Sequence, residues 1–147
     1  MNDMKTIAMR SPYDEVGGLV YFGRLLDRIR LYQDNRLPEE YLEMYGDGFD
    51  ERTCDFLGVS FEALAARVSE GGWDDEILEW CYFAGRRPSS DEIEIWNGFL
   101  SKRGWRDPMA TMIREELAAK GWSERSDIKT LFDFFDADEG RPLRFTE

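Results

Sequence analysis

Short runs of apolar residues at helical spacing, separated by glycine, proline and serine, most constrain what this chain can fold into. The longest run forms one stripe whose members lie three or four positions apart: Leu19, Phe22, Leu26, Ile29 and Tyr32. No segment alternates apolar and polar residues over the length of a strand, and the sequence holds only four valines and five threonines. These patterns predict an all-α fold, a single compact domain of about six to eight mostly short helices around one core.

Helix start and stop signals place the expected elements along the chain. Ser11 and Pro12 indicate a helix start that Gly17 and Gly18 interrupt, and the long helix is expected to begin again near Leu19. The signals that begin the later helices are Ser60, Asp74, Ser89, Pro108, and Ser123 or Ser126. The domain is expected to span residues 1–147, with short, loosely ordered ends at about 1–6 and 143–147.

The same spacing selects the residues expected in the core. They are Leu26, Ile29, Leu64, Ile77, Trp80, Trp96, Ile113, Leu117, Leu131 and Phe132. A chain of 147 residues can bury roughly two thirds of its unfolded surface. The sequence therefore needs neither a disulfide nor a metal ion to hold its core together.

The chain contains no histidine, and this excludes His-based catalytic triads, Cys–His dyads and imidazole metal sites. Its two cysteines, Cys54 and Cys81, do not have the spacing of a metal or redox motif. Cys81 falls on the apolar face of a predicted helix, and Asp55 beside Cys54 would raise the pKa of that thiol. Neither cysteine is expected to act as a nucleophile or to bond to the other, and no cofactor is predicted.

The formal net charge of −12 divides evenly into −6 for residues 1–73 and −6 for residues 74–147. Such a body repels nucleic acid and anionic membranes, so neither is expected as a partner. No apolar run approaches membrane-spanning length, and the sequence predicts a reducing, cytoplasmic location. The cations are 15 arginines and four lysines, and arginine suits bidentate pairing with a carboxylate of the same chain or with a small anionic ligand.

One face of the long helix carries Arg24, Asp27 and Arg28, which lie next to one another at helical spacing. Two guanidinium groups around one carboxylate can present a forked set of donors to a phosphate or carboxylate ligand. The alternative is an ion-pair network with acidic residues of the same chain, expected first among residues 133–139. Arg10 is a further candidate for the same site.

An acidic run near the C-terminus, Asp133–Arg141, raises the question of a metal site. When it is aligned on an EF-hand loop, Gly140 and Arg141 stand where a ligand and a glycine are required. No metal site is therefore predicted. Asp138, Glu139 and Arg141 remain candidates for a binding site shared with the arginine cluster.

Two further features are candidates for binding. The amide of Asn97, beside Trp96, is expected at the edge of the core, where a loop backbone or a pocket ligand would have to satisfy it. If Gly17 and Gly18 precede a helix, their backbone N–H groups can cradle an anion at its N-terminus. The pair lacks the lysine and the spacing of a nucleotide-binding loop, and tight packing is the alternative.

The segments Arg10–Pro12, Gly17–Gly18 and Arg24–Arg30, in this order, resemble the N-terminal signature of DUF5069, a family of bacterial proteins of unknown function. Arg28 and Ile29 stand where the signature is expected to have lysine and alanine. The later segments that resemble the family are Asp55–Gly58, Asp74–Ile77, Trp96–Asn97 and Asp138–Arg141. The resemblance covers about residues 6–142 and implies a small bacterial single-domain protein with a helical fold, but it carries over no catalytic residue.

Two classes of function fit these observations. A non-enzymatic interaction or adaptor module is favoured, because no catalytic, metal or nucleotide motif stands out. The alternative is an anion-binding protein or an enzyme with a site near the Gly17–Gly18 helix start, built from Arg10, Arg24, Asp27, Arg28, Asn97, Asp138, Glu139 and Arg141. The partner is accordingly an unknown protein or a small anionic ligand, and the oligomeric state is left open. A concave pocket holding at least two of these arginines would favour the binder, and a flat apolar patch would favour the adaptor.

Overall fold

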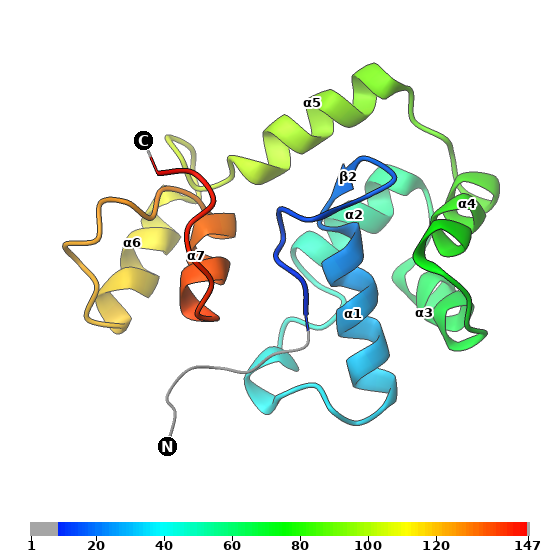
Figure 1. The fold of residues 1–147 in the computed structure, drawn as a ribbon, viewed down its shortest axis with the longest axis horizontal. Coiled ribbons are helices and arrows are strands. Elements are labelled where there is room, and N and C mark those ends of the chain that lie inside the picture. Colours follow the sequence, from blue (N-terminus) through cyan, green and yellow to red (C-terminus); the bar gives the residue numbers. More distant parts are fainter. Residues whose placement is uncertain (1–8, 147) are drawn as a thin grey trace.

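The computed structural model describes residues 9–146, and within them the chain forms seven α-helices and one short hairpin (Figure 1). The helices are α1 (Phe22–Gln33), α2 (Phe49–Leu57), α3 (Phe61–Ser69), α4 (Asp74–Ala84), α5 (Ser90–Ser101), α6 (Ala110–Ala119) and α7 (Leu131–Asp138). One turn of 3-10 helix at Glu39–Tyr41 lies between α1 and α2. This mostly helical, single-domain fold confirms the predicted fold class.

The segment before α1 forms a hairpin and not the predicted helix. Strand β1 (Glu15–Val16) pairs antiparallel with β2 (Leu19–Val20), and Gly17 and Gly18 form the turn with φ values of 58° and 82°. A two-residue hairpin turn requires positive φ at both positions, and glycine adopts it without strain. Because α1 begins only at Phe22, the two glycines do not precede a helix directly, and the condition for an anion cradle at a helix N-terminus is not met there.

The observed N-cap residues match the predicted ones for two helices in the middle of the chain, α3 and α5, and differ for α4 and α7. Ser60 and Ser89 are the N-caps of α3 and α5, and each side chain accepts a hydrogen bond from the third residue of its helix. Asp74 is the first residue of α4 and not its cap. The last helix is capped by Thr130 and not by a serine of residues 123–126.

The buried apolar residues form one main cluster, a second cluster and a smaller third one. The main cluster lies between α1, the hairpin and helices α2–α5, and the second lies between α6 and α7. In Figure 1 α6 and α7 occupy one end of the molecule, α3 and α4 the other, and α5 runs along one edge between them. Phe49 and Phe135 pack against both larger clusters and join them. The predicted core residues are buried except Trp80 and Trp96, which are half-buried because a large indole on a surface helix keeps one edge in water.

Of the two ends predicted to be loosely ordered, residues 1–6 lie outside the described part of the chain. In the C-terminal segment, Arg144 pairs with Asp14 at 3.0 Å, and the rings of Phe145 and Tyr13 meet with centroids 5.4 Å apart. Between residues 9 and 146, no helix has both the length and the apolar character needed to cross a bilayer.

Cys54 and Cys81 are both buried free thiols. Burial raises the pKa of each thiol to about 12. Because the thiolate is the reactive form, we expect neither cysteine of the folded protein to react with a disulfide reagent at mildly alkaline pH. After unfolding without reductant, two thiols per chain should react. A folded protein that reacts at once, or an unfolded one with no free thiol, would contradict this placement.

Candidate functional site

Helix α1 carries two arginines into the interior of the protein. Its apolar side, formed by Leu25, Leu26 and Ile29, is fully buried in the main cluster. On the same helix Arg24 is only 1% exposed and Arg28 only 6%. Removing a guanidinium group from water is costly unless a carboxylate and further hydrogen bonds compensate it. The structure provides a separate carboxylate for each of the two arginines.

Arg24 is paired with Glu139, which follows the last residue of α7. The two Nη nitrogens of Arg24 donate to the two carboxylate oxygens at 2.9 and 2.6 Å. Tyr41 and Arg141 also donate to this carboxylate, at 3.0 and 2.6 Å. Burial by itself would raise the pKa of Glu139, but the hydrogen bonds and charges of Arg24 and Arg141 outweigh it and lower that pKa. The carboxylate is therefore held in its charged form.

Arg28 is paired with Asp50, which is fully buried near the start of α2. The Nε of Arg28 lies 3.2 Å from Oδ2 of Asp50. The hydroxyl of Tyr21 donates to Oδ1 at 2.6 Å, and the N–H of Gly46 donates to Oδ2 at 3.0 Å. Burial raises the pKa of Asp50, and the charge of Arg28 and these hydrogen bonds only partly offset it. This carboxyl group therefore takes up a proton more readily than an exposed aspartate.

A second, half-exposed layer of charges covers the outer side of α1. Arg10 donates to both oxygens of Asp27 at 3.0 Å, and its Nη1 lies 2.8 Å from Asp74. Arg30 reaches the other oxygen of Asp74 at 2.9 Å. Burial alone would raise the pKa of Asp74, but hydrogen bonds from Arg10 and Arg30 outweigh it and lower that pKa. Two arginines and two aspartates thus form a balanced cluster.

The acidic side chains of the run at residues 133–139 point to different partners. Asp133 accepts a hydrogen bond of 2.6 Å from the Tyr13 hydroxyl, and Asp136 accepts one of 3.0 Å from Ser11. Asp138 pairs with Lys120. In the part of the chain that the structure describes, no three potential ligand side chains gather as a metal site would require. Asp136 and Glu139 share Arg141, and each acidic side chain of the run also binds a polar group from another element.

The structure brings six of the predicted site residues into one region around α1: Arg10, Arg24, Asp27, Arg28, Glu139 and Arg141. Asp138 pairs with Lys120 and lies near Tyr41, at the edge of this region. Asn97 lies apart, on α5, where its Oδ1 accepts from the N–H of Val20 and its Nδ2 donates to the carbonyl of Gly18. Its amide therefore fastens α5 to the hairpin, which is the loop-backbone alternative considered from the sequence.

Sequence reasoning missed several members of this network: Tyr21, Tyr41, Asp50 and Asp74. Asp50 lies in an acidic stretch with no distinctive spacing, and only the tertiary fold brings it to Arg28. Tyr21 carried no signal in the sequence, because its position between the hairpin and α1 is known only from the fold. It has a φ of 72°, an unusual conformation for a residue other than glycine.

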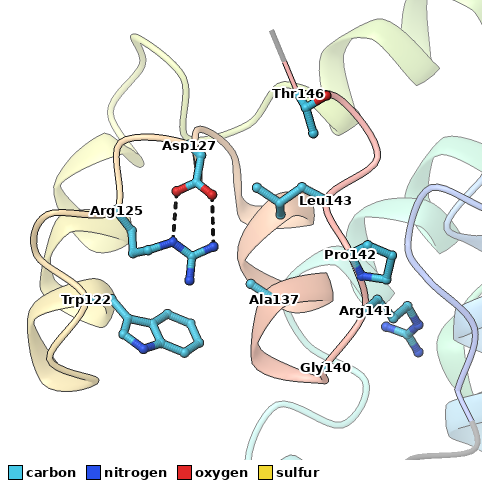
Figure 2. Close-up of a pocket in the computed structure, with 9 residues that line it drawn as sticks. All are labelled: Trp122, Arg125, Asp127, Ala137, Gly140, Arg141, Pro142, Leu143 and Thr146. Carbon is cyan, nitrogen blue, oxygen red and sulfur yellow. Dashed lines mark hydrogen bonds and ion pairs between the residues drawn. The ribbon is translucent and has the colours of Figure 1, made fainter.

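A surface pocket lies beside this network, between the loop after α6 and the C-terminal segment (Figure 2). It has a volume of about 570 Å³ and is lined by Trp122, Arg125, Leu143 and neighbouring residues. Arg125 is engaged by Asp127 through two bonds of 2.9 and 3.0 Å. The side chain of Arg141 points away from the pocket (Figure 2) and into the network, where it binds Glu139. The pocket therefore presents one paired guanidinium group above an indole ring.

A second pocket, of about 530 Å³, is lined by Arg30, Trp73 and Asp74 with their neighbours. Its polar groups belong to the half-exposed charge cluster. Neither of these two pockets holds two of the arginines named as site candidates from the sequence. The condition set for the anion-binding alternative is thus not met at either of them.

These features define a class of small helical domain in which buried arginine–carboxylate pairs join the first long helix, α1, to α2 and to the end of α7. The sequence matches the family model described as a domain of unknown function, DUF5069, over residues 6–141. The chain belongs to that family, as its ordered segments suggested. No curated protein matches the sequence.

Proposed function

We propose that this protein is a non-enzymatic interaction module that binds a protein partner through helix α5, in a cytoplasmic setting. The observation that supports it is the apolar side of α5, which the rest of the domain covers only in part. Of the apolar residues on this helix, Leu100 alone is fully buried. Ile95 is 71% exposed and Phe99 37% exposed, and four positions on a helix place these two side by side.

A continuous aromatic surface extends from these residues across to α2. Trp96 stacks on Phe56 with ring centroids 4.5 Å apart and an interplanar angle of 5°, and Phe99 lies 5.8 Å from Trp96. We call Phe56, Ile95, Trp96 and Phe99 the α5 surface. Exposed apolar groups that form one patch are typical of protein-binding sites, whereas single exposed ones are ordinary.

Guanidinium groups border the α5 surface. Arg52 and Arg103 lie over the ring of Phe99, with centroid distances of 5.1 and 5.2 Å, and Arg86 lies over Phe56 at 5.0 Å. Aromatic and arginine side chains are the residues that contribute most to binding at protein interfaces. Their combination here supports a protein partner in preference to a small ligand.

Helix α5 is held rigidly enough to present this surface. Its first turn is closed by the capping box of Ser89 and Glu92, and its middle is fastened to the hairpin by the two hydrogen bonds of Asn97. A surface that is ordered before binding loses less entropy when a partner docks. The bonds of Asn97 therefore support the proposed role of α5 without touching the partner.

The test is a photo-reactive amino acid placed at Ile95 in cells that naturally make the protein. We expect a discrete cross-linked product from this position. We expect none when the photo-reactive amino acid replaces Trp73, which is also exposed but lies just before the first residue of α4. Binding of the purified cross-linked partner should then weaken about tenfold or more with Phe99→Glu. Trp73→Glu is the matched control and should leave binding unchanged. Equal products from both positions, or a Phe99→Glu variant that binds normally, would refute the proposal.

The alternative of an anion-binding site spread over the whole arginine face has less support. The Nη donors of Arg24 are already bound by Glu139, and those of Arg10 by Asp27 and Asp74, so these two arginines have few donors to offer a ligand. Arg28 differs from both, and its difference leads to a separate inference.

A further inference from the structure

The guanidinium group of Arg28 is buried but incompletely used. Its Nε is a fully buried atom without a hydrogen bond, although Asp50 lies 3.2 Å away as its ion-pair partner. Within residues 9–146, its two Nη nitrogens make no well-directed hydrogen bond, although the Tyr21 hydroxyl lies close enough to interact with this guanidinium group, and they are not among the fully buried atoms that lack a partner. The Nη end of Arg28 therefore retains contact with water while the rest of the side chain is enclosed.

The neighbouring Arg24 shows how differently an arginine on this helix can be satisfied. Both of its Nη nitrogens donate to Glu139, and one also donates to the carbonyl of Arg10 at 3.0 Å. A buried donor without an acceptor destabilises the protein, and arginine has five donors to satisfy. The Nε of Arg24 is buried without a hydrogen bond, as is that of Arg28, but the Nη nitrogens of Arg24 are bound, whereas those of Arg28 make no well-directed hydrogen bond.

The groups around Arg28 are held in place by other contacts. Asp50 accepts from Tyr21 and from the N–H of Gly46, so it is fixed on the Nε side of the guanidinium group. The ring of Tyr41 lies 5.8 Å from the guanidinium carbon and forms a wall beside it. The Nη end is thus the part of the guanidinium group that these neighbours leave for a further acceptor.

We propose that Arg28 anchors an oxyanion site, in which its two Nη nitrogens bind a phosphate or carboxylate group beside the ring of Tyr41. Paired Nη donors match the two oxygens of such a group, as in bidentate arginine recognition of carboxylate and phosphate. The site is separate from the α5 surface, so this proposal is independent of the proposed interaction function.

The charges around the site allow an anion to bind but limit its affinity. Arg24 and Arg28 are balanced by Glu139 and Asp50, so the incoming group meets no excess of negative charge. Asp50 is nevertheless a carboxylate next to Arg28 and repels a second anion. Removing the charge of Asp50 should therefore strengthen binding.

The experiment follows the Nε–Hε NMR signal of Arg28 in the full-length protein during titration with inorganic phosphate, and separately with acetate, at constant ionic strength. We expect a saturable shift of this signal with at least one of the two probes. Asp50→Asn should bind the same probe about tenfold more tightly. Arg28→Lys, which keeps the charge but loses the fork, should bind it about tenfold more weakly or not at all. The probe that binds more tightly identifies the preferred kind of oxyanion.

The matched control is Arg30→Lys, a change two positions away on α1 at a half-exposed arginine that is paired with Asp74. It should bind like the natural protein. A loss equal to that of Arg28→Lys would mean unspecific attraction of ions to the surface and would overturn the proposal. An Arg28 signal that moves with neither probe, or an Asp50→Asn variant without tighter binding, would overturn it as well. These last two results decide the question even if Arg28→Lys fails to fold.

Discussion

Replacing Glu139 with alanine is expected to lower the free energy of unfolding by about 3–5 kcal/mol, because it leaves the buried guanidinium of Arg24 without a partner. The Glu139 carboxylate is almost fully enclosed and accepts hydrogen bonds from Arg24, Tyr41 and Arg141. Urea denaturation followed by circular dichroism measures the loss. Asp127→Ala is the control, since Asp127 also binds an arginine but does so in water, and we expect it to leave stability unchanged.

Two further measurements separate the loss of the ion pair from a general disturbance of α7. In Arg24→Met combined with Glu139→Leu no charge remains uncompensated, so most of the lost stability should return. The second measurement is the pH dependence. Because the pKa of Glu139 is lowered in the folded protein, its contribution is present above its ordinary pKa of 4.5 and is lost as the pH falls. The natural protein should therefore lose stability in acid more steeply than Glu139→Gln, and equal slopes would show that Glu139 contributes nothing by its charge.

Phe132→Ala is expected to destabilise the protein by about 3–5 kcal/mol, since the ring is completely buried and its removal leaves a cavity. The ring centroid lies 5.1 Å from that of Tyr13, 5.7 Å from Phe49 and 6.1 Å from Tyr21, so the cavity would open where α7 meets the main cluster. The same denaturation experiment measures it. Phe145→Ala removes an exposed ring and should have little effect. A loss below about 1 kcal/mol for Phe132→Ala would show that α7 does not pack on the main cluster as described.

The parts of the fold that could be predicted are those in which local chemistry and tertiary packing agree. Helices α3 and α5 are capped by Ser60 and Ser89 as predicted, because a serine side chain can accept a hydrogen bond from the first turn wherever the helix packs. The hairpin could not be predicted from alternation, because each of its strands has only two residues. From the sequence, two consecutive glycines fit a hairpin turn and a break between two helices equally well.

The candidate site was predictable on one side only. Residues 133–139 were the expected partners of the arginine face, and Glu139 is indeed bound to Arg24. The partner of Arg28 is Asp50, which local spacing does not distinguish from the other acidic residues around it. Trp96 was expected in the core because of its helical spacing. Spacing reports which side of a helix a residue occupies, but not how much of that side the rest of the protein covers.

The pair between Arg24 and Glu139 joins residues 115 positions apart, and this separation has a consequence for protein synthesis. A ribosome releases α1 long before it has made the carboxylate that allows Arg24 to leave water. Until then, burying Arg24 would strand a charge in the interior, so the early helices cannot close completely around α1. The last helix thus completes the folding of the first. A chain that is cut short before residue 139 keeps part of its interior open to chaperones and proteases, and in this way incomplete copies differ from finished ones.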